Sequence, residues 1–214
     1  MDIAIPLFDR FTALDAVGPY EVLSRLPGAT VTFVGEAQGP VRTDTGALAI
    51  TVDRTLDEAP APDVVVVPGG PGTRAMLEPG PLHAWVAAAH GSTEWTTSVC
   101  TGSLILAAAG VLDGLEATTH WASMDLLAGL GVTPVDDRRV VVQGKVVTAA
   151  GVSSGIDMAL WLAAQIAGDD VAKAIQLGIE YDPQPPFDHG SVHKADPGIV
   201  AFLREIVVDP APAP

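Results

Sequence analysis

The chain has 214 residues, of which 48% are hydrophobic and 17% charged, so it can bury a sizeable core without disulfides or metal ions. Its 26 acidic residues outnumber 11 basic ones and give a formal charge of −15, which argues against partners such as nucleic acid and anionic membranes, because a negative surface repels phosphate groups. The single cysteine excludes an internal disulfide and a cysteine-rich metal site, and the five histidines show no metal-ligand spacing.

The N-terminal half alternates apolar runs of strand length with helical patterns. Residues 3–8 predict a buried strand, and residues 16–26 predict a helix that Pro27-Gly28 ends. The elements predicted next, in chain order, are strands at Thr30–Gly35, at residues 47–52 after a turn at Gly39-Pro40 and at Val64–Val67, a helix over residues 82–89 and a strand at residues 93–99. Four consecutive valines at 64–67 are typical of a strand buried on both faces of a parallel sheet.

The C-terminal half is richer in helical patterns. Helices are predicted over residues 101–109, 122–130, 155–167, 170–179 and 196–207. Short strands are predicted at residues 132–135, 140–142 and 145–148, the last two joined by a hairpin turn at Gln143-Gly144. Residues 209–214 are expected to form a frayed Pro/Ala tail.

Strand–helix alternation of this kind predicts one open α/β domain over residues 1–208, with a mostly parallel sheet and helices on both faces. Such sheets place their sites beyond the carboxyl ends of the strands. The chain shows neither the basic start and long apolar run of a signal peptide nor the roughly 20 apolar residues of a membrane span. We therefore expect a cytoplasmic protein.

A candidate nucleophile follows one of these strands. Cys100 comes directly after the predicted strand at residues 93–99, and a helix begins one or two residues later. This strand–turn–helix junction is the geometry of a nucleophile elbow, in which Gly102 allows close packing of helix on strand. The unpaired N–H groups at the start of the helix favour a thiolate. An inert buried cysteine is the alternative.

A glycine-rich segment, Pro68-Gly69-Gly70-Pro71-Gly72, follows the strand Val64–Val67. Glycines at a strand end let main-chain N–H groups approach a ligand, as in an oxyanion hole. The segment lacks the lysine of a phosphate-binding loop and the GxGxxG spacing, so a nucleotide is not expected. A tight turn without a ligand explains it equally well.

Asp15 is the only acid in an apolar patch, Leu14 to Pro19, near a predicted helix start. Aspartate is among the best helix N-caps, and capping is its more common role in this setting. The functional alternative is a carboxyl group that faces Cys100 across the strand ends.

Two further segments are candidate pocket walls. His120, followed by Trp121, could pair with Cys100, although a lone histidine is more often a structural hydrogen-bonding residue. Residues 176–187 end a helix in a proline-rich loop, which could wall a pocket, meet a second subunit or serve only as a connection.

Taken together, these motifs resemble the ThiJ/PfpI superfamily, which shares the class I glutamine amidotransferase-like, flavodoxin-like fold, and within it the isocyanide hydratases. The motifs that carry the resemblance are Leu14-Asp15-x-x-Gly18-Pro19, Pro68-Gly69-Gly70, Thr97-Ser98-Val99-Cys100-Thr101-Gly102-Ser103-Leu104, Ala117-Thr118-Thr119-His120-Trp121-Ala122 and residues 176–187. Asp15 stands where most of the superfamily has glutamate, which fits the hydratase branch. Thr101 replaces the histidine that follows the cysteine in PfpI-type proteases, which counts against peptidase activity.

The resemblance implies that the chain hydrates an isocyanide to an N-substituted formamide without a metal or organic cofactor. Cys100 would attack the terminal carbon while Asp15 delivers a proton, and water would release the covalent thioimidate. N–H groups near Gly70 and Thr101 would stabilise developing charge, and His120 and Trp121 would shape the pocket. A homodimer is also implied.

Two other functions fit the same residues. One is another thiol enzyme of this superfamily, with glyoxalase-like or amidase-like activity. The other is a redox sensor or chaperone without catalytic activity, whose cysteine oxidises to sulfenic or sulfinic acid.

Overall fold

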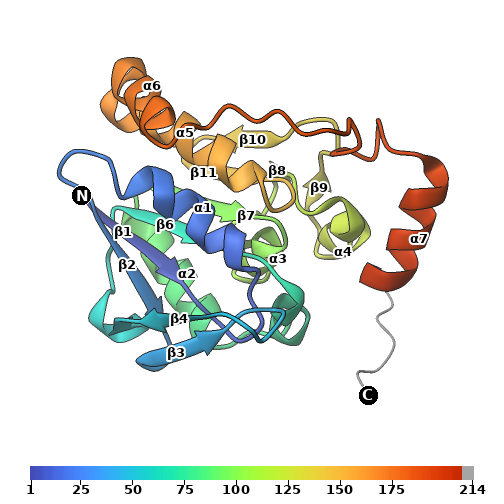
Figure 1. The fold of residues 1–214 in the computed structure, drawn as a ribbon. Helices are drawn as coiled ribbons and strands as arrows, with labels where there is room; N and C mark the ends of the chain where they lie inside the picture. Colours follow the sequence, from blue (N-terminus) through green and yellow to red (C-terminus); the bar gives the residue numbers. More distant parts are fainter. Residues whose placement is uncertain (209–214) are drawn as a thin grey trace.

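A seven-stranded sheet forms the centre of the computed structural model, which describes residues 1–208 (Figure 1). In spatial order the strands are β10 (Val140–Gln143), β11 (Val146–Ala149), β7 (Trp95–Val99), β6 (Val64–Val67), β1 (Asp2–Pro6), β2 (Thr30–Gly35) and β5 (Arg54–Thr55). All neighbouring pairs are parallel except the β10–β11 hairpin. The predicted α/β class with an open, mostly parallel sheet is therefore confirmed.

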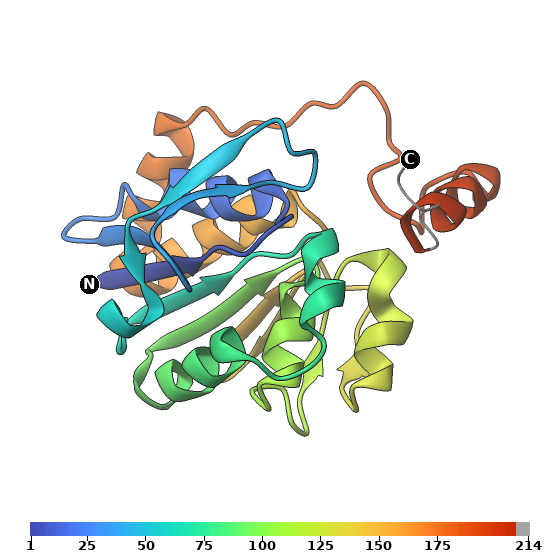
Figure 2. The ribbon, with the colours of Figure 1, turned by 90° about the horizontal axis from the view of Figure 1, so that it is seen from below.

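Helices cover both faces of this sheet (Figure 2). One face carries α1 (Ala13–Leu23), α5 (Ser154–Ala167) and α6 (Asp169–Gly178). The other face carries α2 (Pro81–Ser92) and α3 (Gly102–Ala108), with α4 (Met124–Gly129) beside α3. Because β1, β6 and β7 run parallel to one another, the loops that leave their carboxyl ends lie at the same edge of the sheet.

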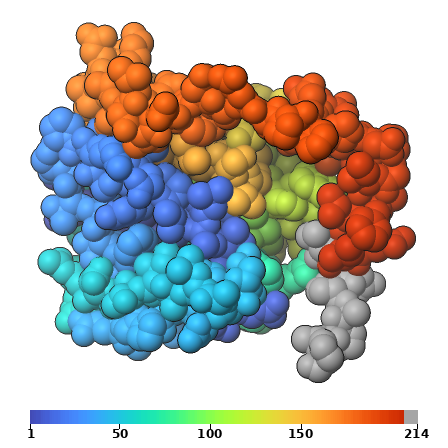
Figure 3. Space-filling model, viewed as in Figure 1, coloured from blue at the N-terminus to red at the C-terminus, as the bar shows by residue number. Residues whose placement is uncertain are grey.

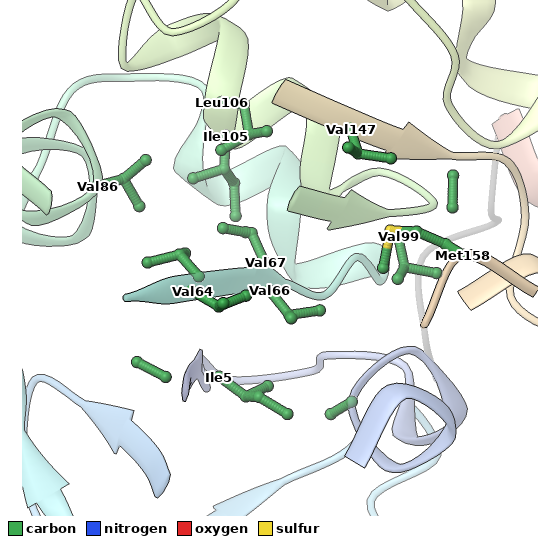
Figure 4. Close-up of a cluster of buried hydrophobic side chains, with 14 of the residues drawn as sticks. Ile5, Val64, Val66, Val67, Val86, Val99, Ile105, Leu106, Val147 and Met158 are labelled. Atoms are coloured by element: carbon green, nitrogen blue, oxygen red, sulfur yellow. The ribbon is translucent and has the colours of Figure 1, made fainter. Parts of the chain in front are cut away.

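The core consists of branched aliphatic side chains stacked on both sides of the central strands (Figure 4). All four valines of β6 are buried, as their position between β1 and β7 requires. Ile5 packs from β1 and Ile105 from α3, so the element that follows Cys100 is anchored in the core. Because these side chains are closely packed, the sheet is rigid near the carboxyl ends of its strands.

The expected turn at Gly39-Pro40 is wrong. Both residues lie in β3 (Gly39–Arg42), which pairs antiparallel with β4 (Ala49–Val52) in a separate two-stranded sheet. Proline is tolerated there because each strand of a two-stranded ribbon has a free edge. The strand expected at residues 47–52 therefore pairs outside the main sheet.

Several predicted boundaries also differ from those observed. The first strand ends at Pro6 rather than Phe8, and the helix expected over residues 122–130 consists of a 3₁₀ turn, η3 (Trp121–Ser123), followed by α4. The strand expected at residues 132–135 shortens to β9 (Thr133–Pro134), which pairs with β8 (Glu116–Ala117). The elements β8, β5 and the 3₁₀ helices η1 (Leu56–Glu58) and η2 (Pro71–Met76) were not predicted, because elements this short have too few residues to show a hydrophobic periodicity.

The last part of the described chain runs from α6 along the top edge of the molecule in Figure 3 and ends in α7 (Pro197–Val208). This helix confirms the one predicted over residues 196–207. The predicted tail at residues 209–214 lies outside the described residues. Within the described part, no helix is long and apolar enough to cross a membrane.

Candidate active site

Cys100 occupies the turn between β7 and α3, so the expected strand–turn–helix junction is confirmed. Its φ of 57° lies in the left-handed region, which costs a residue with a side chain about 1–3 kcal/mol. Hydrogen bonds hold it there: the Cys100 N–H donates to the carbonyls of Ala149 (3.0 Å) and Ala150 (2.9 Å), and the Thr119 hydroxyl donates to the Cys100 carbonyl (3.0 Å). The sulfur is thereby directed away from the strand that precedes it.

Gly102 allows the elbow to form. A Cβ at this position would lie 2.1 Å from the carbonyl oxygen of Val67, at the end of the neighbouring strand β6. No larger residue fits without separating α3 from the sheet. The close helix–strand packing expected of this glycine is confirmed.

Asp15 lies in the first turn of α1 and does not cap it, because the N-cap is Thr12. The predicted capping role is therefore wrong. The side chain is fully buried, its Oδ2 accepts a hydrogen bond from the N–H of Gly69 (2.9 Å), and the carboxyl group lies close enough to Cys100 to influence the pKa of its thiol. The two groups meet because β1, which precedes α1, and β7, which precedes Cys100, both flank β6.

Burial has the largest effect on the pKa values of Asp15 and Cys100. It raises the pKa of Asp15 from 3.8 to about 7, against the opposing effect of the Gly69 N–H. Burial also raises the pKa of the Cys100 thiol, and the negative charge of Asp15 raises it further. Both shifts oppose a second negative charge on the pair, so at neutral pH the pair retains at least one proton, and burial of the thiol opposes the resting thiolate expected from the helix start.

Main-chain N–H groups surround the sulfur. Thr101 and Val152 each provide an N–H that hydrogen-bonds to Cys100 and lowers the pKa of its thiol, without outweighing burial. The N–H of Gly70, in contrast, donates to the Thr101 hydroxyl (2.8 Å) and is engaged within the protein. Of the two expected main-chain donors, only Thr101 thus faces the sulfur.

A cavity of about 260 Å³ opens over Cys100, and we call it the Cys100 cavity. The residues that line it come from both halves of the sheet: Thr12, Asp44, Gly70, Pro71, Thr73, Arg74, Cys100, Thr101, Leu104, His120, Ser123, Leu126 and Val152. Leu104, Leu126 and Val152 give it apolar walls. Cys100 is only 5% exposed, so the cavity presents the sulfur to a small molecule while shielding it from bulk solvent.

Two features of this site carry no signal in the sequence. Val152 lies 52 positions after Cys100, and nothing in its neighbourhood marks it, since it contributes a backbone N–H rather than a side chain. The Thr12 hydroxyl donates to Asp44 Oδ2 (2.9 Å) at the cavity wall, and the charge of Asp44 contributes to raising the pKa of Asp15. Asp44 lies in an irregular segment whose placement no periodic pattern predicts.

His120 lines the Cys100 cavity, as the resemblance led us to expect. Its Nδ1 accepts a hydrogen bond from the N–H of Ala122 (3.3 Å), so a neutral ring carries its hydrogen on Nε2. Burial lowers the pKa of His120, which favours the neutral form at pH 7.

Trp121 does not line the Cys100 cavity, in contrast to the expectation. It lines a second cavity of about 360 Å³, the polar cavity, and the guanidinium of Arg204 on α7 lies over its ring at 5.6 Å. Within the described chain, no residue of 176–187 lines the Cys100 cavity either. Tyr181 from that loop instead donates to Asp157 Oδ1 on α5 (2.7 Å), which fixes the loop against the helix.

A cysteine at a strand–turn–helix elbow, beside a buried acid and on a flavodoxin-like sheet, is an arrangement that points to one protein family. Residues 1–165 match the model of the DJ-1/PfpI family, and the chain belongs to this family.

Two similar proteins cover nearly the whole chain. Isonitrile hydratase of Pseudomonas putida is 43% identical over 205 residues, which span 96% of this chain and 89% of that protein. The crystal structure of a ThiJ/PfpI family protein from Pseudomonas syringae superposes with a TM-score of 0.92 at 37% identity, over 97% of this chain and 86% of that one.

The fold extends to more distant relatives. Drosophila melanogaster DJ-1beta superposes with a TM-score of 0.75 at 25% identity, over 85% of this chain and 98% of its own. The chain is therefore a DJ-1/PfpI protein and a homologue of isonitrile hydratase.

Proposed function

We propose that this protein hydrates an isocyanide, R–N≡C, to an N-substituted formamide through a covalent bond to Cys100. The observation that carries the proposal is the thiol of Cys100, which faces a small, largely apolar cavity beside the buried carboxyl group of Asp15. An isocyanide needs a nucleophile and an acid at the same carbon. The 43% identity to isonitrile hydratase over nearly the full chain supports the assignment.

In the first half of the reaction, the shared proton moves from the sulfur to Asp15 as the sulfur attacks the terminal carbon. The N–H groups of Thr101 and Val152 stabilise the negative sulfur during this step. Asp15 then gives its proton to the same carbon, which produces a thioimidate, Cys100–S–CH=N–R. Asp15 is placed for both transfers because it contacts the sulfur, and its Oδ1 has no hydrogen-bond partner among the described residues.

In the second half, a water molecule adds to the thioimidate carbon. Asp15, ionised again, accepts a proton from the water and passes it to the nitrogen. The carbon–sulfur bond then breaks, the second water proton returns to the sulfur through Asp15, and the formamide leaves. The cycle restores one proton and one negative charge on the pair.

Replacing the nucleophile tests the proposal directly. The parent protein should convert para-nitrophenyl isocyanide to its formamide, and Cys100→Ala should abolish conversion because no sulfur remains to bond the carbon. Chromatographic detection of the formamide is the measurement. Methylglyoxal serves as the parallel substrate: consumption of methylglyoxal without any formamide production would instead support a glyoxalase-like enzyme.

Replacing the acid tests the second role. Asp15→Asn keeps an oxygen for the Gly69 N–H but cannot carry the proton, so we expect turnover to fall by about 100-fold or more, the usual scale for a general acid–base group. The initial rate of formamide production is compared at equal protein concentration. Turnover at the parent rate would show that Asp15 is not the proton donor.

A further inference from the structure

The polar cavity lies on the other side of His120 from Cys100. Two residues, His120 and Val152, line both this cavity and the Cys100 cavity and so form the partition between them. Several polar side chains also line the polar cavity, among them Thr118, Thr119, Asp136, Arg139 and Ser153. Its volume of about 360 Å³ has room for several water molecules.

A buried hydroxyl in this cavity requires a partner. Thr118 lines the polar cavity and is fully buried, and its Oγ1 has no hydrogen-bond partner among the described residues. Its N–H donates to Thr148 Oγ1 (2.9 Å), which fixes the residue in place. Because buried hydroxyl groups are almost always hydrogen-bonded, the natural partner of Thr118 Oγ1 in a polar cavity is water.

The ring of His120 is oriented for contact with the polar cavity. A Cβ added to Gly151, which lines that cavity, would lie 2.8 Å from Cδ2 and 3.6 Å from Nε2, so this edge of the ring faces Gly151. Nε2 carries the hydrogen, since Nδ1 accepts from Ala122. The segment is tied to the nucleophile by the bond between the Thr119 hydroxyl and the Cys100 carbonyl.

The second half of the proposed reaction needs a water molecule at the thioimidate carbon. Once the isocyanide is bonded to Cys100, its substituent occupies the Cys100 cavity, whose walls at Leu104, Leu126 and Val152 are apolar. A cavity on the other side of His120 would give the hydrolytic water a separate route to the carbon. His120 and Val152 lie between the sulfur and this second cavity.

We propose that the polar cavity supplies the water that hydrolyses the Cys100 adduct and that His120 is the residue that positions this water. The inference rests on the proposed function. In the step concerned, a bond forms between the water oxygen and the thioimidate carbon, and the carbon–sulfur bond breaks. One water proton ends on the nitrogen and the other on the sulfur, while His120 donates a hydrogen bond and keeps its own proton.

Two variants separate hydrolysis of the adduct from its formation. Thr118→Val removes a hydroxyl group from the polar cavity at nearly constant volume and does not alter the lining of the Cys100 cavity. His120→Phe keeps a ring in the partition and removes its N–H. The protein is loaded with para-nitrophenyl isocyanide and desalted, and intact mass then follows the decay of the adduct.

We expect adduct decay slowed by about fivefold to tenfold in each variant, the effect of one lost hydrogen bond, and adduct formation within twofold of the parent rate in Thr118→Val, which does not line the Cys100 cavity. His120→Gln, which retains an N–H donor, should restore part of the decay rate. Thr93→Val is the matched control, because it removes a buried threonine hydroxyl that lines neither cavity, and its decay should match the parent.

Decay at the parent rate in both variants would overturn the inference, as would a slowing of adduct formation instead of decay. A parent protein that forms no adduct and no formamide would remove the proposed function, and this inference with it. The two outcomes can be told apart: failure of the proposed function is seen in the parent protein, whereas failure of this inference is seen only in the variants.

Discussion

Asp15 and Cys100 show how burial sets the chemistry of single residues in this protein. Each group alone is ordinary, but the fold removes both from water and places them in contact, so their two pKa values rise together. A shared proton is the consequence, because two negative charges in contact and out of water are unfavourable. The same proton serves attack and protonation in the proposed reaction.

The raised pKa of Asp15 predicts a pH dependence of stability. Between pH 3.8 and about 7 the folded chain holds a proton that the unfolded chain has lost, so the free energy of unfolding falls as pH rises through this interval. A rise of about three pKa units corresponds to a loss on the order of 4 kcal/mol. Asp15→Asn removes this contribution, so the variant should gain stability relative to the parent as pH rises from 4 to 8.

Urea unfolding of both proteins at pH 4 and pH 8 measures the effect. The comparison between parent and variant isolates Asp15 from other carboxyl groups such as Glu58, whose pKa is lowered and whose contribution has the opposite sign. The same stability difference at both pH values would contradict the prediction.

The junction of β6, β7 and α3 shows how the packing of a helix on the sheet positions Cys100. Cys100 adopts a left-handed conformation because β7 ends there and α3 begins immediately, over the end of β6. The approach is so close that only a glycine fits at 102. Sub-ångström placement of the sulfur therefore depends on the packing of α3 against the sheet.

Gly102→Ala should separate α3 from β6 and displace Cys100, the proposed nucleophile. The added Cβ meets the Val67 carbonyl at 2.1 Å, and backbone at this distance must move. A displacement of about 1 Å at a nucleophile costs roughly 100-fold in rate. We expect a lower Tm in thermal unfolding and a loss of kcat/KM of this size.

Gly91→Ala provides the matched control. Gly91 lies in α2 with nothing within 4 Å of an added Cβ, so alanine should raise stability by about 0.4–1 kcal/mol and leave turnover unchanged. Parent-like stability and activity in Gly102→Ala would show that the elbow does not need this contact.

At the scale of the whole molecule, α7 leaves large apolar side chains exposed. Ile199, Phe202 and Ile206 are each about half exposed or more, on a helix at the end of an extended segment (Figure 1). Exposed apolar clusters of this kind commonly mark association surfaces. The homodimer implied by the family resemblance stays a prediction, and these side chains are consistent with it.

The charge of −15 makes the predicted dimer sensitive to salt. Two copies repel one another, and added salt screens this repulsion, so we expect the dimer to dissociate less at 0.5 M than at 0.05 M salt. Sedimentation should give about twice the 22.0 kDa chain mass at high salt. A monomer mass at both salt concentrations would exclude the dimer.

Local patterns in the sequence determined the architecture and the position of Cys100 at the elbow. Alternating strand and helix periods predict the parallel sheet, and the buried run that ends at Val99, followed by Cys100 and Gly102, predicts the elbow. These features are predictable because each depends on the burial and backbone conformation of neighbouring residues. The strand at Gly39–Arg42 was missed because proline and glycine signal a turn unless a partner strand is known.

Only the tertiary structure decided what Asp15 does. Its local sequence favours a helix cap, and its contact with a sulfur 85 positions away arises from the order of strands in the sheet. The same holds for the Val152 N–H, for the raised pKa of the thiol and for the position of Trp121 outside the Cys100 cavity. Desolvation and contacts between remote segments depend on how all elements pack, and no short stretch of sequence contains that information.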